Sequence, residues 1–122
     1  MDFLILGLNH KTAPVEIRER VSFSTSGISC ALRLLQKYPF VSESLILSTC
    51  NRVELYAVVE DKVEGLKSLK EFLYRYHELK DSLDPYLYFY ENELALRHTF
   101  RVTSSLDSMV VGENQILHQV RQ

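Results

Sequence analysis

The residues with the clearest chemical potential are a cysteine and an arginine in the segment Cys50-Asn51-Arg52. A free thiol has a pKa of about 8.5, so nucleophilic use of a cysteine requires a nearby cation, a helix N-terminus or a base. Arg52 could supply that positive charge, or it could bind a carboxylate through its planar guanidinium. The alternative interpretations are a turn cysteine without chemistry and an arginine paired with Glu54 or a neighbouring strand. Spacing alone leaves these alternatives open.

His98 is a candidate for proton transfer, because a histidine close to a thiol in space forms a proton-transfer pair. The sequence does not place His98 beside Cys50, and a surface histidine is the alternative. The polar, glycine-marked stretch 107–115 is typical of a loop that leads into a helix. Asp107 or Ser108 in such a loop more often caps the helix than binds a ligand.

Both cysteines are predicted to be free thiols, because Cys30 and Cys50 are widely separated and no secretory leader precedes them. The start Met1-Asp2-Phe3-Leu4 has neither a basic leader nor a small-residue cleavage site, so we expect a cytoplasmic protein. Two cysteines alone cannot form a structural zinc site, and we expect no metal. Cys30 interrupts an apolar helical pattern, so we expect it to be a small buried side chain without a chemical role.

Composition excludes several classes of protein. A chain of 122 residues with 46% hydrophobic residues fits one globular domain, and no apolar run is long enough to cross a membrane. The 14 basic and 16 acidic residues argue against a freestanding nucleic-acid-binding domain. The glycines at positions 7, 27, 65 and 112 form neither a dinucleotide-binding fingerprint nor a phosphate loop. We therefore predict no cofactor bound through either motif.

The hydrophobic pattern predicts the elements that must position these residues. Apolar runs and alternation indicate strands at 3–8, 44–49, 53–59 and 86–90, and helical spacing indicates helices at 15–19, 28–38 and 63–76. The order βαββαβ predicts an α+β fold with a ferredoxin-like antiparallel sheet and helices on one face. C-terminal helices follow, the first with Leu94, Leu96, Phe100 and Val102 at its apolar positions. Cys50 then lies in a hairpin link at the edge of the sheet.

Three blocks, in this order, resemble the glutamyl-tRNA reductase family. They are 7–14 (GLNHKTAP), 47–56 (LSTCNRVELY), and 97–102 (RHTFRV) followed by 105–117 (SLDSMVVGENQIL). The resemblance implies that the Cys50 thiolate attacks the ester of glutamyl-tRNA and releases the tRNA. The resulting thioester is reduced by NADPH to glutamate-1-semialdehyde, at the start of tetrapyrrole (porphyrin) biosynthesis.

The resemblance also implies roles for individual residues. His98 matches the family histidine proposed to assist proton transfer, and Arg52 is the expected partner of the glutamyl side-chain carboxylate. The other substrate-binding residues implied are Thr49, Cys50, Asn51, Ser108, Glu113, Asn114, Gln115 and Gln119. Asn114 stands at a position that varies among family members.

The resemblance covers nearly the whole chain and implies that residues 1–122 form the N-terminal catalytic, substrate-binding domain. The NADPH-binding and dimerisation domains of the family are absent from the chain, so it should carry substrate binding and thioester formation but not the reduction. Glutamyl-tRNA, a second subunit in a homodimer and the semialdehyde aminomutase are the implied partners; no membrane is implied.

Two other functions are compatible with the residues. The first is a module that binds aminoacylated tRNA ends without chemistry. The second is a thiol redox sensor built on Cys50, which predicts sulfenic acid formation without preference for glutamyl esters. The absence of a resolving cysteine at an obvious spacing disfavours the sensor.

Overall fold

The computed structural model describes the backbone of residues 1–109 and the side chains of residues 1–105. The strands are β1 (Asp2–Asn9), β2 (Val41–Ser48), β3 (Arg52–Val59) and β4 (Tyr88–Glu91). The helices are α1 (Val15–Val21), α2 (Ile28–Gln36), α3 (Lys62–Tyr76) and α4 (Asn92–Met109). All four predicted strands and the three predicted helices before β4 are present, with ends that differ by a few residues.

The four strands form one antiparallel sheet in the order β2-β3-β1-β4. This order confirms the predicted ferredoxin-like α+β fold, because β3 lies between β1 and β2 and β1 lies between β3 and β4. Strands β2 and β3 form the predicted hairpin, which closes at the pair Ser48 and Val53. The central strands β1 and β3 pair over their full length, from Asp2 opposite Val59 to Asn9 opposite Arg52.

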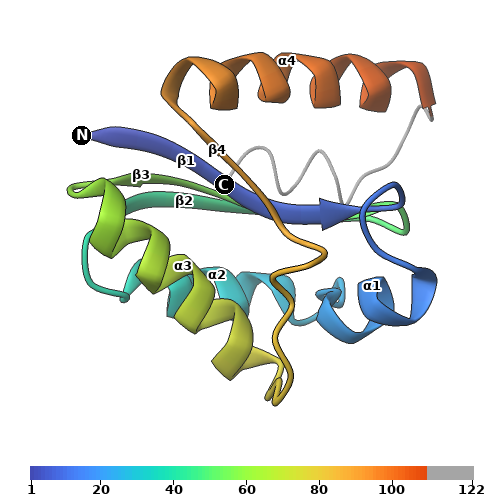
Figure 1. The fold of residues 1–122 in the computed structure, drawn as a ribbon, viewed down its shortest axis with the longest axis horizontal. Coiled ribbons are helices and arrows are strands. Elements are labelled where there is room, and N and C mark those ends of the chain that lie inside the picture. Colours follow the sequence, from blue (N-terminus) through green and yellow to red (C-terminus); the bar gives the residue numbers. More distant parts are fainter. Residues whose placement is uncertain (110–122) are drawn as a thin grey trace.

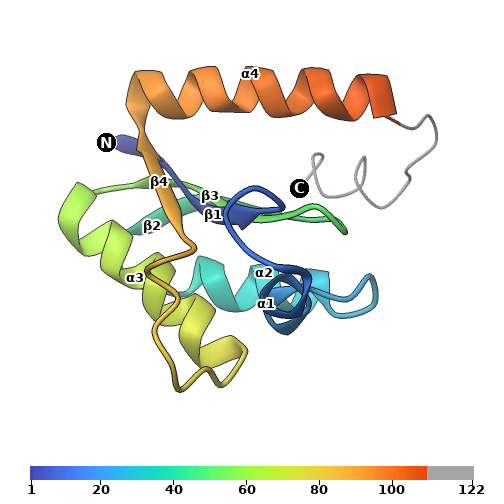
Figure 2. The same ribbon diagram turned by 45° about the vertical axis from the view of Figure 1, so that its right-hand side comes forward.

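The two faces of the sheet are covered by different helices. Figures 1 and 2 show α1, α2 and α3 on one face and α4 alone on the other. Because side chains alternate along a strand, Leu4, Leu6 and Leu8 of β1 point into the core under α2 and α3. Ile5 and Gly7 point to the α4 face. The larger core therefore lies on the side of the three helices, and a smaller apolar cluster that includes Ile5 lies on the α4 face.

Helix α4 meets the sheet with a face that excludes its largest apolar residues. Leu94, Leu96 and Phe100 are 57%, 49% and 64% exposed, whereas Ala95, His98 and Val102 are buried. Positions 95, 98 and 102 follow one another at helical spacing and form the stripe that contacts the sheet. Of the four apolar residues expected in this helix, only Val102 is buried, and the small Ala95 packs against the strands beside it.

A single asparagine redirects the chain from β4 into α4. Asn92 adopts the left-handed conformation (φ 49°), which asparagine tolerates better than most residues. Its side-chain oxygen accepts a hydrogen bond from the Phe3 amide at 3.0 Å, and its side-chain amide donates to Asp2 at 2.9 Å. The start of α4 is thereby tied to the start of β1, which directs the helix along the open face of the sheet.

Two predictions were wrong. Residues 107–109 belong to α4 rather than to a loop, because the helix continues to Met109. Cys30 is exposed rather than buried, because it lies on the solvent side of α2, whose buried residues are Ile28, Ala31 and Leu35. Among the described residues, no helix combines the length and the apolar character needed to span a membrane.

Candidate active site around the loop between β2 and β3

The loop that carries Cys50 is closed by a threonine side chain instead of a glycine turn. The Thr49 hydroxyl oxygen accepts hydrogen bonds from the amides of Asn51 and Arg52 at 3.1 and 3.2 Å. The Thr49 amide donates to the Arg52 carbonyl at 2.8 Å, which continues the hairpin pairing. A threonine that binds the backbone in this way replaces the turn residues a tight hairpin usually needs. Cys50 is exposed at the tip of this ordered loop.

Arg18 of α1 fixes the loop from the side of the three helices. Its Nε donates to the Cys50 carbonyl at 3.3 Å, and its Nη1 donates to the Ala13 carbonyl at 2.7 Å. Arg18 and Cys50 both line a cavity of about 260 Å³ between α1 and the end of β2, together with Thr49 and Phe23. The cation closest to the thiol's cavity is therefore a residue of α1 and not Arg52.

On the other face of the sheet, a buried carboxylate collects four donors. Glu54 is 0% exposed, and its Oε1 accepts a hydrogen bond from Tyr56 at 2.7 Å. Its Oε2 accepts from Arg52 at 3.3 Å and also bonds Tyr88 and the Nε2 of His98. An ionised carboxylate is costly to bury unless its oxygens are satisfied, and here both are. The network joins β3, β4 and α4 at one point.

The network determines the protonation of its members. Burial alone would raise the pKa of Glu54, but the hydrogen bonds from His98, Tyr88 and Tyr56 outweigh it, so the pKa lies below its ordinary value. Burial and the adjacent Glu54 charge both raise the pKa of Tyr56 and of Tyr88 above their ordinary values. At neutral pH the carboxylate is therefore ionised and both phenols remain hydrogen-bond donors.

Gly7 makes room for this network. In the sheet register Gly7 of β1 stands between Glu54 of β3 and Tyr88 of β4. A Cβ atom at this position would lie 2.6 Å from the Val53 carbonyl oxygen and 2.7 Å from the Cγ of Glu54. The glycine thus allows the carboxylate to cross β1 and reach the tyrosine.

We expect Gly7→Ala to destabilise the fold by about 1–3 kcal/mol, because the added methyl group overlaps with backbone and with the Glu54 side chain. Urea unfolding measures the change. Gly27→Ala is the matched control, since its Cβ would meet the movable Ser24 hydroxyl at 2.8 Å and nothing else closer than 3.5 Å. Equal effects of the two substitutions would contradict the steric role assigned to Gly7.

Arg52 and His98 open onto a second cavity, of about 440 Å³, between the β1–α1 turn and α4. His10 and Lys11 of the turn and Arg101 of α4 complete its basic lining. No carboxylate lines this cavity within the described part of the chain, and Glu54 lies beneath its wall. The cavity is suited to an anionic group. Arg52 uses Nη1 for Glu54, which leaves other N–H groups of its guanidinium for a ligand.

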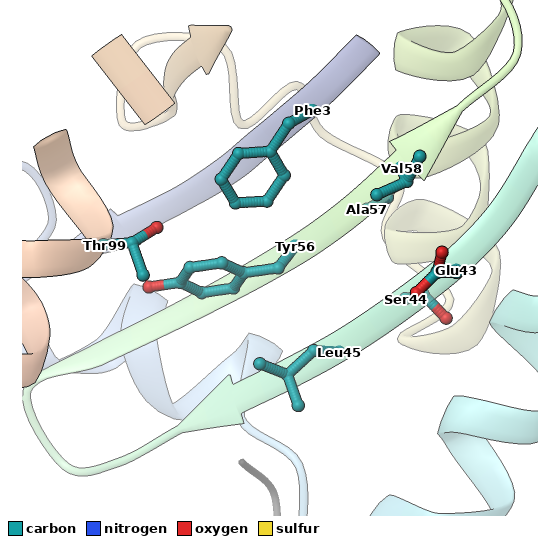
Figure 3. Close-up of a pocket in the computed structure, with 8 residues that line it drawn as sticks. All are labelled: Phe3, Glu43, Ser44, Leu45, Tyr56, Ala57, Val58 and Thr99. Atoms are coloured by element: carbon teal, nitrogen blue, oxygen red, sulfur yellow. The ribbon is translucent and has the colours of Figure 1, made fainter. Parts of the chain in front are cut away.

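A third cavity, of about 290 Å³, lies on the α4 face toward β2. Figure 3 shows the Tyr56 ring between Phe3 and Leu45, with its hydroxyl toward Thr99. Its lining is mostly apolar, with Glu43, Ser44 and Thr99 as polar residues, and it includes none of Cys50, Arg52 and His98. Its main role is to hold Tyr56, which orients the carboxylate of Glu54.

The structure brings only some of the predicted residues together. Arg52 and His98 share the basic cavity, whereas Thr49 and Cys50 line the cavity beside α1. His98 is 6% exposed, so the surface alternative for it was wrong, and the ion pair of Arg52 with Glu54 is present. Of the remaining predicted residues, Asn51 lies in the loop and Ser108 lies in α4 by its backbone, while Glu113, Asn114, Gln115 and Gln119 lie outside the described residues.

Sequence reasoning missed the roles of Glu54 and Arg18. A signal for Glu54 was present: alternation along β3 puts Arg52, Glu54 and Tyr56 on one face, opposite the apolar Val53 and Leu55. A charged residue in the middle of an otherwise buried strand requires partners. Arg18 gave no comparable signal, because its contact with Cys50 joins residues 32 positions apart.

Comparisons with known proteins agree with the resemblance. The family model described as "Glutamyl-tRNAGlu reductase, N-terminal domain" matches residues 6–122. The chain is 53% identical to glutamyl-tRNA reductase of Pelobacter propionicus and 49% identical to that of Bacillus pumilus, each over 122 residues and 99% of this chain. These alignments cover 28% and 27% of the relatives, so the chain spans little more than a quarter of their length.

A solved structure, glutamyl-tRNA reductase from Methanopyrus kandleri, has a similar fold. The TM-score is 0.61 at 32% sequence identity, and the match covers 98% of this chain and 26% of that chain. The fold described above is therefore found as one part of a larger protein.

Proposed function

Because the chain belongs to the glutamyl-tRNA reductase family through its N-terminal domain, we propose that it binds glutamyl-tRNA and accepts the glutamyl group on Cys50. The observation that carries this proposal is the exposed thiol on the loop fixed by Thr49 and Arg18, one residue before Asn51 and two before Arg52. A thiol in this position is accessible to a bulky ester. The backbone around it is held by Arg18 of α1 and by the Thr49 side chain of the loop itself. We propose residues 1–122 as the catalytic, substrate-binding domain.

The proposed step is an acyl transfer. The Cys50 thiol gives up its proton to solvent, and the thiolate sulfur attacks the ester carbonyl carbon of the glutamyl group. The bond from that carbon to the ribose oxygen breaks, and the leaving oxygen takes up a proton, so that a thioester and free tRNA remain. We assign the delivery of that proton to His98, which Glu54 holds at the wall of the basic cavity.

Arg52 is the proposed site for the side-chain carboxylate of the glutamyl group. Its guanidinium lines the basic cavity, whereas Cys50 lines the cavity beside α1, so we propose that one bound substrate extends from Cys50 past the loop into the basic cavity. Thr49 and Asn51, together with Ser108, Glu113, Asn114, Gln115 and Gln119, remain the other proposed substrate-binding residues. Glu54 competes for Arg52 through one N–H group only, so the arginine can pair with a second carboxylate.

The test compares two donors on the 122-residue chain. After incubation with glutamyl-tRNA, mass spectrometry should find the glutamyl group on Cys50, whereas a tRNA charged with glutamine should acylate it at least about tenfold more slowly. Arg52 is already paired with Glu54, and a substrate carboxylate adds a charge-assisted hydrogen bond to its guanidinium, whereas the neutral amide of glutamine makes a weaker one.

Arg52→Gln supplies the control for specificity, because it should lower the rate with glutamyl-tRNA and remove most of the difference between the two donors. Equal rates with both donors on the unchanged chain would contradict the role of Arg52. A chain that binds glutamyl-tRNA without ever acquiring the acyl group would instead be the binding module.

The reduction to glutamate-1-semialdehyde is assigned to a part of the protein outside this chain. In the family's reaction NADPH supplies a hydride, but the described glycines do not form a site for it. Gly7 lies within β1 under Glu54, and Gly65 packs within α3 against Val59. Gly27 precedes α2 but follows α1, so none of the three lies at a turn from a strand into a helix, where dinucleotide phosphates bind. We therefore propose that an NADPH-binding domain elsewhere in the protein completes the reaction.

Family resemblance supports three further proposals for the whole protein. We propose that it acts in the cytoplasm as a homodimer and passes its semialdehyde product to the aminomutase that follows in tetrapyrrole biosynthesis. The share of the relatives that this chain spans, 28%, leaves room for the domains that these functions require.

A further inference from the structure

The basic cavity carries more positive charge than the binding of one carboxylate requires. Arg52 and His98 at its inner wall are already bonded to Glu54, whereas Lys11 and Arg101 at its rim are not. Within the described part of the chain, neither rim cation makes an ion pair or a side-chain hydrogen bond. On α4 the contrast is direct, because Arg97, one turn before Arg101, pairs with Glu93 at 2.8 Å.

The rim cations are carried by ordered backbone that is joined to the nucleophile's loop. The Asn9 side-chain oxygen accepts hydrogen bonds from the amides of Lys11 and Thr12 at 2.9 and 3.2 Å, which fixes the turn after β1. The His10 amide donates to the Asn51 carbonyl at 2.8 Å. The turn and the β2–β3 loop therefore lie side by side at one end of the sheet, as Figures 1 and 2 show.

We propose that Lys11 and Arg101, with His10 between them and the loop, bind the terminal phosphodiesters of the tRNA acceptor strand. This inference rests on the proposed function, which places the ester carbonyl at Cys50. The ester is carried by the terminal ribose, so the nearest phosphodiester must lie within one nucleotide of the thiol. The rim offers that phosphate two cations, while the inner wall, already neutralised by Glu54, accepts the single carboxylate of the glutamyl group.

A local cluster of cations at the rim explains how a chain with a formal net charge of −2 can bind RNA. Binding of RNA depends on the local neutralisation of phosphates and not on the total charge of the protein. A small basic rim beside the nucleophile orients the end of the strand, and the remaining contacts with tRNA belong to other parts of the protein. The expected affinity of this chain alone is accordingly modest and strongly dependent on salt.

The test measures the binding of deacylated tRNA for glutamate to the 122-residue chain, its Lys11→Gln and Arg101→Gln variants, and the double variant. Each substitution should raise the dissociation constant about three- to tenfold and reduce the slope of log affinity against log salt by about one. Arg97→Gln is the matched control, since Arg97 lies on the same helix outside the cavity, and its affinity and slope should not change.

Acylation of Cys50 by glutamyl-tRNA, measured on the same proteins, separates the two proposals. If the rim variants bind tRNA more weakly but the unchanged chain is never acylated, the phosphate-binding role of the rim is supported and acyl transfer to Cys50 is contradicted. Unchanged dissociation constants in both rim variants, or no measurable binding of tRNA by the unchanged chain, would contradict the proposed binding of phosphate by Lys11 and Arg101.

Discussion

Cys50→Ser should abolish acylation of the chain by glutamyl-tRNA. A serine hydroxyl is a far weaker nucleophile than a thiol without a dedicated base, and Arg18 and Thr49 hold the backbone of the loop without providing one. We expect the rate of acyl transfer to fall at least about a hundredfold. Mass spectrometry of the intact chain and of its peptides measures both the rate and the position of the acyl group.

Cys30→Ser is the matched control, because Cys30 is also a free, exposed thiol and lies on α2, away from both cavities. Its acylation rate should equal that of the unchanged chain. Both substitutions should change the free energy of unfolding by no more than about 0.5 kcal/mol, because both side chains are exposed. Acylation that persists in Cys50→Ser, or that is found on Cys30, would exclude Cys50 as the nucleophile.

Glu54→Gln should destabilise the fold by about 2–4 kcal/mol, the largest effect on stability that we expect from one isosteric substitution in this chain. Glutamine has one acceptor oxygen instead of two and carries no charge, so in either orientation its amide nitrogen, a donor, faces a group that now donates to Glu54. Urea unfolding at neutral pH measures the loss. The same variant should slow acylation of Cys50 because Arg52 and His98 lose their common anchor.

The contribution of Glu54 should also depend on pH. Its pKa is below the ordinary value in the folded chain, so the unfolded chain binds the proton more tightly. The stabilisation is therefore fully present above the unfolded pKa of about 4.3 and is lost as the pH falls through the lower folded pKa. The difference in unfolding free energy between the unchanged chain and Glu54→Gln should be constant above about pH 5.5 and shrink below pH ~4.

Two control substitutions distinguish the loss of the Glu54 hydrogen-bond network from the loss of a negative charge as the cause of the lower stability. Glu60→Gln removes a carboxylate that is exposed directly after the same strand, and we expect an effect within about 0.5 kcal/mol. Tyr88→Phe removes one donor and leaves Glu54 three others, so it should cost about 1 kcal/mol. A Glu54→Gln variant as stable as Glu60→Gln would show that the network does not stabilise the fold.

The sequence by itself determined the elements and their order. Alternation in 53–59 and helical spacing in 63–76 are local properties, so they predicted β3 and α3 to within a residue. The same local information placed Cys50 at the tip of a hairpin, because two strands separated by three residues have few other ways to pair. The chemical identity of the thiol as a candidate nucleophile required no more than this placement and the family motif.

Only the tertiary structure decided which side chains meet. His98 and Glu54 are 44 positions apart, and they are brought into contact by the sheet register and by Asn92, which directs α4 over that face. The buried side of α4 carries Ala95, His98 and Val102 and not its largest apolar residues, so the side that contacts the sheet is known only from the packing. Long-range contacts depend on the packing of whole elements, and the local pattern of a sequence does not record that packing.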